Sequence, residues 1–277
     1  MTEYLTVDDG TIAYEVAGEG PLVVLAPGMG DSREAYRFVS PRLVAAGYRV
    51  AAVDIRGCGE SSARWPSYSR TDIAGDLLAV IRLLGGPAVL VGHSISGGAA
   101  TIAAAQAPDL ITGIVELGPF TRGQSFKLGD LRFGGYRKAA LQMAGAGMLG
   151  SVARWRGYLD SAYPGKKPAD WTERLAQIDA MLREPDRMKA FQKMFQSAPT
   201  DAGAQLENVR CPALIVQGSL DPDWADPRAE GEAIVAALPA GLGRLEMIEG
   251  AGHYPHVQYP DDVVSLMLAF LHAHARA

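Results

Sequence analysis

The sequence of 277 residues contains only two cysteines, Cys58 and Cys211. Two cysteines cannot make a disulfide-rich scaffold, and each lies in or beside a segment predicted below to belong to the core. We therefore expect free thiols and a cytoplasmic location, because a reducing compartment keeps thiols unpaired. The first residues lack a basic segment followed by an apolar run, so no signal peptide is predicted.

Long hydrophobic runs and runs of basic residues are absent as well. No stretch of about 18 apolar residues occurs, so no transmembrane helix and no membrane partner are predicted. The net charge is −5, with charges of both signs mixed along the chain. This balance argues against nucleic acid as a partner. The hydrophobic fraction of 48% is enough for one large core, or for a core domain with an inserted subdomain.

Short apolar runs recur along the chain and predict strands, most of them buried on both faces. They lie at 21–28, 48–57, 87–93, 111–118, 212–218 and, more weakly, 243–250. Alternating residues on both sides of Asp9-Gly10 predict a hairpin before them. Helical patterns lie at 33–46, 72–84, 95–107, 227–238 and 261–273. The alternation predicts an α/β fold, with a mainly parallel twisted sheet flanked by helices.

One segment interrupts this alternation, because residues 120–205 contain no convincing strand pattern. Four stretches within it have a helical pattern: 135–150, 151–160, 170–183 and 186–198. We therefore predict one core domain built from residues 1–119 and 206–277, with an inserted all-helical lid at 120–205. Since the lid would leave and re-enter the core at the carboxyl ends of strands, it is expected to cover the site there.

The stretch Val89–Gly98, VLVGHSISGG, places one hydroxyl between a predicted strand and a predicted helix. In an open parallel sheet, sites form at the carboxyl ends of the strands. A tight strand-to-helix turn projects its central residue into such a site and requires small neighbours. Ser94 has Gly92 and Ser96 on either side, and the amino end of the helix favours a developing negative charge. A helix N-cap without chemistry is the alternative interpretation of this serine.

This stretch resembles the nucleophile elbow of the α/β-hydrolase family, whose usual form is G-x-S-x-G. Here Ser96 stands where the last glycine is usual, as in the bacterial stress-response hydrolases and the plant strigolactone and karrikin receptors of that family. The resemblance covers most of residues 14–117 and 209–271. It implies an α/β-hydrolase fold and a serine nucleophile that acts with a histidine and an acid, without a cofactor.

The family's chain order of serine, acid and histidine matches candidates at two further strand ends. Asp221 follows the predicted strand at 212–218, and His253 follows the one at 243–250. Their side chains are therefore expected to converge on Ser94, with His253 as the base and Asp221 as the acid that orients it. Asp223 is the second candidate for the acid and Asp226 the third.

Two backbone N–H groups are expected to stabilise the oxyanion. One belongs to Ile95, the residue after the nucleophile. By resemblance the other belongs to Met29, in the loop that follows the first core strand. Relatives have His-Gly-x-Gly in this loop, whereas here Pro27 replaces the histidine. Asp54 and Arg56, in a second motif of the family, are expected to brace the turn beneath the site.

Candidates for contact with the substrate are Gly28, Phe120, Trp155, Phe195 and Tyr254. No metal is expected, because His253 and His256 have no third ligand at metal-site spacing. The glycines at 145, 147 and 150 match G-x-G-x-x-G but follow a helical pattern, so dinucleotide binding is not expected.

The resemblance implies cleavage of a small or medium hydrophobic acyl substrate: an ester, lactone, thioester or amide. The serine disfavours the dehalogenases and epoxide hydrolases of the family, whose elbow carries aspartate. Two alternatives stay open. One is a small-molecule receptor with slow turnover that acts through a protein partner, although no feature of the sequence indicates such a partner. The other is a cofactor-free haloperoxidase or a hydrolase of carbon–carbon bonds.

Overall fold

In the described part of the chain, eight strands form one sheet in the order β1-β2-β4-β3-β5-β6-β7-β8. The computed structural model describes residues 1–123 and 128–275. The strands are β1 Glu3–Val7, β2 Gly10–Ala17, β3 Leu22–Ala26, β4 Arg49–Val53, β5 Ala88–His93, β6 Ile111–Leu117, β7 Ala213–Gly218 and β8 Gly243–Ile248. The hairpin β1–β2 is antiparallel, β2 also runs antiparallel to β4, and all later pairs are parallel. The predicted α/β fold class and all six predicted core strands are thereby confirmed.

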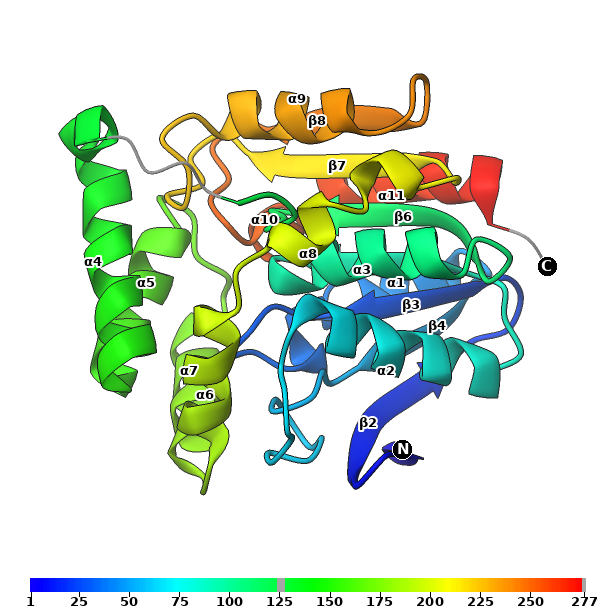
Figure 1. Ribbon diagram of the computed structural model, residues 1–277, viewed down its shortest axis with the longest axis horizontal. Helices are drawn as coiled ribbons and strands as arrows, with labels where there is room; N and C mark the ends of the chain where they lie inside the picture. The colour runs from blue at the N-terminus through cyan, green and yellow to red at the C-terminus, as the bar shows by residue number, and fades with distance from the viewer. Residues whose placement is uncertain (124–127, 276–277) are drawn as a thin grey trace.

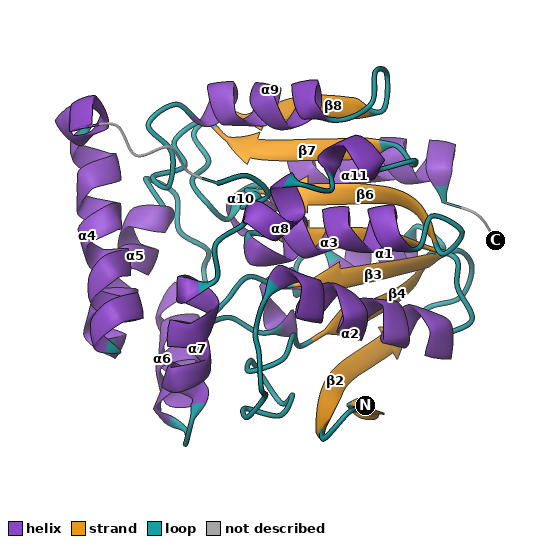
Figure 2. Cartoon of the chain, viewed as in Figure 1, coloured by secondary structure: helices purple, strands orange, loops and turns teal. Residues whose placement is uncertain are grey.

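Helices cover both faces of the sheet, as Figures 1 and 2 show. The helices α2 Arg70–Leu83, α3 Ile95–Gln106 and α9 Pro227–Ala237 contribute to one apolar core, and α1 Ser40–Ala45 and α11 Pro260–His274 contribute to the other. Every residue of β3, β5 and β7 is buried, because the central strands have helices on both sides. Their carboxyl ends meet at one edge, where the candidate residues lie.

Two of the predicted core helices differ most from the observed bounds. The helical pattern at 33–46 forms a 3₁₀ helix at Arg33–Tyr36 and then the separate helix α1. Pro41 explains the break, because it has no N–H to donate to the preceding turn of a continuous helix. Helix α2 begins two residues earlier than predicted, because the Ser69 hydroxyl and the Asp72 carboxylate form a reciprocal capping box.

The described residues between β6 and β7 form helices and no strand. The longer ones are α4 Gly134–Leu149, α5 Val152–Ala162, α6 Trp171–Arg183 and α7 Arg187–Gln196, followed by the short α8 Thr200–Gly203. In Figure 1, α4–α7 stand beyond the end of the sheet to which the arrow of β7 points. Residues 124–127 of the predicted lid lie outside the described residues.

Ionic contacts attach these helices to the loops at the end of the sheet. Arg174 of α6 donates to the carboxylate of Asp31, and both side chains are buried. Arg37 makes a bidentate pair with Asp170 at 2.5 and 2.7 Å. Because the cost of removing two charges from water offsets much of their attraction, such contacts join the insertion to the core while adding little net stability.

Both cysteines are buried and unpaired. Within residues 1–123 and 128–275, no helix combines the length and the apolar character needed to cross a membrane.

Candidate active site

Ser94 occupies a strained turn between β5 and α3. Its φ of 55° and ψ of −119° lie in a region that a residue with a side chain rarely adopts. Hydrogen bonds hold the turn, because Ser94 N donates to Leu117 O at 3.0 Å and Ser94 O accepts from Phe120 N at 3.1 Å. A Cβ atom on Gly92 would lie 2.0 Å from the carbonyl oxygen of Ser96, so only glycine fits there. The turn has the geometry that the sequence motif predicts.

Ser96 provides a contact that the usual glycine of the motif could not. Its hydroxyl donates a hydrogen bond of 2.5 Å to the carbonyl oxygen of Pro27, in the loop that follows β3. Both groups are buried. The elbow is therefore tied directly to the loop that contains Met29.

The acid and the histidine meet at the carboxyl ends of β7 and β8. His253 Nδ1 lies 3.0 Å from Asp221 Oδ2, and both side chains are buried. Asp221 is held from two further sides, because Oδ2 accepts from Gln217 Nε2 at 2.9 Å and Oδ1 accepts from Asp223 N at 3.0 Å. The Nδ1–H tautomer of His253 is thereby favoured, which leaves Nε2 as the proton acceptor.

Asp223, the second candidate acid, approaches the same nitrogen. Its Oδ2 lies 3.2 Å from His253 Nδ1 and accepts a hydrogen bond of 2.6 Å from the hydroxyl of Tyr158 in α5. Asp226, the third candidate, instead caps α9 by accepting from Ala229 N at 3.0 Å. One imidazole thus faces two carboxylates, and the insertion supplies a donor to one of them.

The charges at this cluster shift the affinity of its groups for protons. Burial alone would lower the pKa of His253, but the carboxylates of Asp221 and Asp223 outweigh it and raise the pKa to about 9. Burial raises the pKa of Asp223 to about 6, against the opposing effect of His253. The base is therefore protonated over a wider pH range than a free histidine.

The two predicted oxyanion donors belong to residues at the cavity of Ser94. Met29 and Ile95 line the same cavity as Ser94. Ile95 is the first residue of α3, and N–H groups in a first helical turn have no acceptor within the helix. A Cβ atom on Gly28 would lie 3.1 Å from Ser94 Cβ and 2.9 Å from His93 Nδ1, so glycine allows the loop to approach the elbow.

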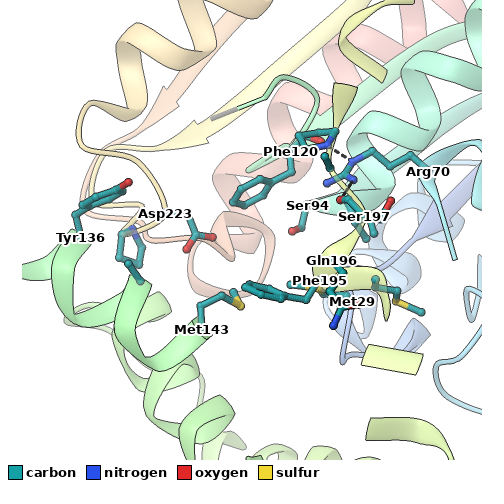
Figure 3. A pocket seen from close by; sticks show the side chains of 16 residues that line it. Met29, Arg70, Ser94, Phe120, Tyr136, Met143, Phe195, Gln196, Ser197 and Asp223 are labelled. Atoms are coloured by element: carbon teal, nitrogen blue, oxygen red, sulfur yellow. Dashed lines mark hydrogen bonds between the residues drawn. The ribbon is translucent and has the colours of Figure 1, made fainter. Parts of the chain in front are cut away.

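A cavity of about 400 Å³ opens over Ser94 (Figure 3). Its wall comes from the elbow, from the first residue of α2, from the insertion and from the loop after β7. The lining residues are Met29, Arg70, Ser94, Ile95, Phe120, Tyr136, Ala140, Met143, Met194, Phe195, Gln196, Ser197, Ala198, Pro199, Pro222 and Asp223. Among the described residues, no hydrogen bond joins the Ser94 hydroxyl to His253, and such contacts often shorten only when substrate binds.

The chain matches the model of a family described as "Alpha/beta hydrolase family" over residues 23–266. It belongs to the alpha/beta hydrolase family. This identification confirms the resemblance found in the elbow, in the order of the candidate residues and in the sheet. It establishes a hydrolase family and leaves the substrate open.

Curated relatives of this alpha/beta hydrolase include an enzyme and a receptor. It is 26% identical over 283 residues to the 2-(acetamidomethylene)succinate hydrolase of Mesorhizobium japonicum, covering 96% of this chain and 94% of the relative. It is 26% identical over 266 residues to the Karrikin insensitive 2 receptor CA of Petunia hybrida, covering 93% and 94%.

Solved structures support the fold of this alpha/beta hydrolase. The esterase EaEST of Exiguobacterium antarcticum matches with a TM-score of 0.82 and 19% identity, covering 98% of this chain and 100% of the other. The enol-lactonase of Burkholderia xenovorans LB400 matches with a TM-score of 0.76 and 22% identity, again covering 98% and 100%. At these identities the likeness concerns the fold alone.

The predicted substrate contacts are only partly placed at the cavity of this alpha/beta hydrolase. Phe120 and Phe195 line it. Trp155 does not, because its ring stacks on Tyr158 with centroids 4.9 Å apart in the core of the insertion. Tyr254 does not either, because it stacks on Tyr163 with centroids 4.6 Å apart. Gly28 packs against the elbow and does not line the cavity, so contact of Gly28, Trp155 and Tyr254 with substrate remains a prediction.

The cavity of this alpha/beta hydrolase also has lining residues that sequence reasoning missed. Arg70, Tyr136 and Met143 come from helices far from the elbow in the sequence. A helical pattern shows that such residues share a helix, but not which neighbour the helix faces. Asp223 differs from these residues, because its place on the same loop as Asp221 made it a candidate from the sequence.

Two further histidines of this alpha/beta hydrolase, His93 and His256, are buried near His253 and pack against neighbouring groups. His93 Nε2 hydrogen-bonds the carbonyl oxygen of His253 at 2.9 Å, and His256 stacks on Tyr36 with ring centroids 5.1 Å apart. Burial lowers the pKa of His93, and it lowers that of His256 to about 3. Asp221, Asp223 and His253 offer metal-ligand atoms within 4.8 Å of one another. The hydrogen bonds of Gln217 and Tyr158 to these oxygens fit acid–base chemistry better.

Proposed function

We propose that the protein is a serine hydrolase that cleaves a small or medium hydrophobic carboxylic ester or lactone through an acyl-enzyme. One observation carries this proposal. Ser94 stands in a strained turn at a cavity wall, and the loops after β7 and β8 hold His253 against Asp221. Strain of this kind persists only where the surrounding structure enforces it, which is common at catalytic groups.

The proposed reaction begins when Ser94 Oγ attacks the carbonyl carbon of the substrate. Its proton passes to Nε2 of His253, while Asp221 holds Nδ1–H and stabilises the imidazolium. The N–H groups of Met29 and Ile95 stabilise the oxyanion. His253 then gives the proton to the leaving alcohol, and the carbonyl reforms as the acyl-enzyme. Water, deprotonated by His253, releases the acid and regenerates Ser94. No cofactor takes part in this sequence.

The helical insertion, residues 120–205, is proposed to act as a lid that sets the size of the substrate. Phe120 at its start and Phe195 near the end of α7 line the cavity together with Met143 of α4. These apolar side chains favour a hydrophobic acyl or alcohol group. The chemistry itself remains with residues of the core.

Covalent labelling tests this function directly. A fluorophosphonate probe is expected to label the protein and not the Ser94→Ala variant, which should also lose about 10⁴- to 10⁶-fold in kcat on p-nitrophenyl esters of increasing chain length. Ser61→Ala is a suitable control, because Ser61 is buried beneath the loop of Asp54 and its hydroxyl donates to the Asp54 carbonyl, outside the cavity. Labelling of Ser94→Ala at the parent rate would contradict the proposal.

A receptor with slow turnover is the second candidate, favoured by the similarity to the karrikin receptor over nearly the full length of both chains. In that case the hydrolytic site would serve ligand recognition, and a partner protein would read the surface of the insertion. A multiple-turnover assay separates the two functions. A single burst of product without further turnover would favour the receptor, whereas sustained turnover would favour the enzyme.

A further inference from the structure

A buried cation lies in the wall of the cavity. Arg70 is the first residue of α2, yet only 4% of its surface is exposed. Its side chain passes over Gly98 of α3, where a Cβ atom would lie 2.7 Å from Arg70 Cδ. The small residues that follow Ser94 therefore serve a second purpose, because they leave room for an arginine to reach the cavity.

The hydrogen-bond partners of this guanidinium are neutral. Nε donates to Phe120 O at 2.9 Å, and Nη1 donates to Ser197 O at 2.9 Å. A guanidinium has five N–H groups, so these two bonds leave donors for a further acceptor. Arginine is charged throughout the physiological pH range, and although burial lowers the pKa of Arg70, it does so only to about 10.

No carboxylate balances this charge at close range within the described part of the chain. Asp201 acts on Arg70 only as a more distant charge, and its Oδ2 accepts hydrogen bonds from Thr71 N at 3.3 Å and Thr71 Oγ1 at 3.1 Å. A buried charge without a paired counter-ion is costly, and such groups are usually paired. The cavity is therefore the side from which a counter-ion can approach.

The wall of the cavity contains charged groups of opposite sign, the guanidinium of Arg70 and the carboxylate of Asp223. In Figure 3, Arg70 and Asp223 lie apart, with the ring of Phe120 between them in the view. Much of the remaining lining is apolar, with Met29, Met143 and Phe195 among the larger side chains. Because such a lining screens charges weakly, an anionic group of a ligand would be attracted to Arg70 and repelled by Asp223.

We propose that Arg70 binds an anionic group of the substrate, most simply a carboxylate, while the scissile carbonyl lies at Ser94. The substrate class is then an ester, lactone or related acyl compound that carries a free carboxylate on an otherwise apolar skeleton. This inference rests on the proposed function, and it adds to that function an orientation of the substrate. Charge-assisted hydrogen bonds from the planar guanidinium would fix that orientation.

Matched substrates test the inference. Monomethyl esters of C4 to C6 dicarboxylic acids are compared with the neutral methyl esters of monocarboxylic acids of the same length. The protein is expected to show a higher kcat/KM for one or more of the half-esters. Arg70→Gln is expected to lower kcat/KM for that half-ester about 10- to 100-fold more than for its neutral counterpart, as for a lost hydrogen bond to a charged group.

Two variants separate recognition from support of the fold. Arg70→Lys keeps the charge but not the fork geometry, and it should retain part of the preference. Arg122→Gln is the matched control, because Arg122 also lies near the start of the insertion but pairs with Glu230 at 3.2 Å, outside the cavity lining. It should leave the preference for the half-ester unchanged. Melting temperatures report any loss of folding.

The outcomes are distinguishable from failure of the proposed function. Equal losses on charged and neutral esters in Arg70→Gln, or no preference in the parent protein, would overturn the assignment of Arg70. If fluorophosphonate labels nothing, the hydrolase proposal fails instead. Calorimetric titration of the parent and of Arg70→Gln with adipate then decides the anion site, since tighter binding to the parent supports it and equal binding overturns it.

Discussion

The carboxylate of Asp223 lies 3.2 Å from Nδ1 of His253, only slightly farther than the 3.0 Å that separates this nitrogen from Asp221. The two acids nevertheless differ in their surroundings. Asp221 accepts hydrogen bonds from Gln217 and from the backbone of its own loop, whereas Asp223 lines the cavity and accepts from Tyr158 of the insertion. Asp221 thus has a fixed orientation, and Asp223 has one that depends on the insertion.

This difference predicts unequal effects of two isosteric substitutions. Asp221→Asn should lower kcat by about 10³- to 10⁴-fold, because the amide no longer fixes the tautomer or stabilises the imidazolium. Asp223→Asn should lower it by about tenfold or less, since Asp221 still holds Nδ1–H and stabilises the imidazolium. Steady-state kinetics on one p-nitrophenyl ester checks this order. A larger loss in Asp223→Asn would exchange the roles of the two acids.

The same two charges predict an alkaline rise in activity. His253 must be neutral to accept the proton of Ser94, so a raised pKa moves the rise of kcat/KM to higher pH. The midpoint is expected above the usual value of about 6.5 for histidine, toward the value of about 9 that the paired carboxylates impose.

Removing one of these charges should reverse part of that shift. In Asp223→Asn the imidazolium loses a stabilising negative charge, so the pKa of His253 falls and the midpoint moves to lower pH. Asp226→Asn is the control, because Asp226 is exposed and caps α9 without contact to His253. A midpoint that stays in place in Asp223→Asn would mean that this carboxylate does not affect the base.

Two aromatic residues of the insertion should respond differently to truncation. Phe195→Ala enlarges the cavity and is expected to shift the preference among p-nitrophenyl esters toward longer acyl chains, because Phe195 lines it. Trp155→Ala should leave the preference largely unchanged and cost about 3–5 kcal/mol of stability, because that ring is buried. Urea denaturation measures the stability, and a chain-length series measures the preference. The same shift in both variants would contradict the placement of Trp155.

The hydrogen bond from Ser96 to Pro27 predicts a role for the residue that replaces the usual glycine of the motif. Ser96→Ala removes this bond of 2.5 Å, which should cost about 1 kcal/mol of stability. Because the bonded loop contains the proposed oxyanion donor Met29, kcat should fall more than KM changes. The rate of fluorophosphonate labelling provides a second readout. Unchanged kinetics in a destabilised variant would limit Ser96 to a structural role.

The sequence by itself determined the features that depend on residues close together in the chain. Apolar runs and helical periodicity predicted six core strands and the helices between them, because these patterns reflect local backbone geometry. Glycine and serine around Ser94 predicted the strained turn for the same reason, since only small residues fit within it. The assignment of Ser94, Asp221 and His253 combined their positions just after predicted strands with the chain order that the family resemblance implies. The family match over residues 23–266 confirmed the resemblance.

Tertiary structure alone decided which side chains from distant segments meet. It brought Asp223 as well as Asp221 to His253, buried Trp155 against Tyr158, and led Arg70 over Gly98 into the cavity. Periodicity assigns a residue to a helix face, but the packing of helices and loops far apart in the chain decides what that face touches. The strands of the core could therefore be predicted from the sequence, whereas the residues that line the cavity could be identified only in the folded protein.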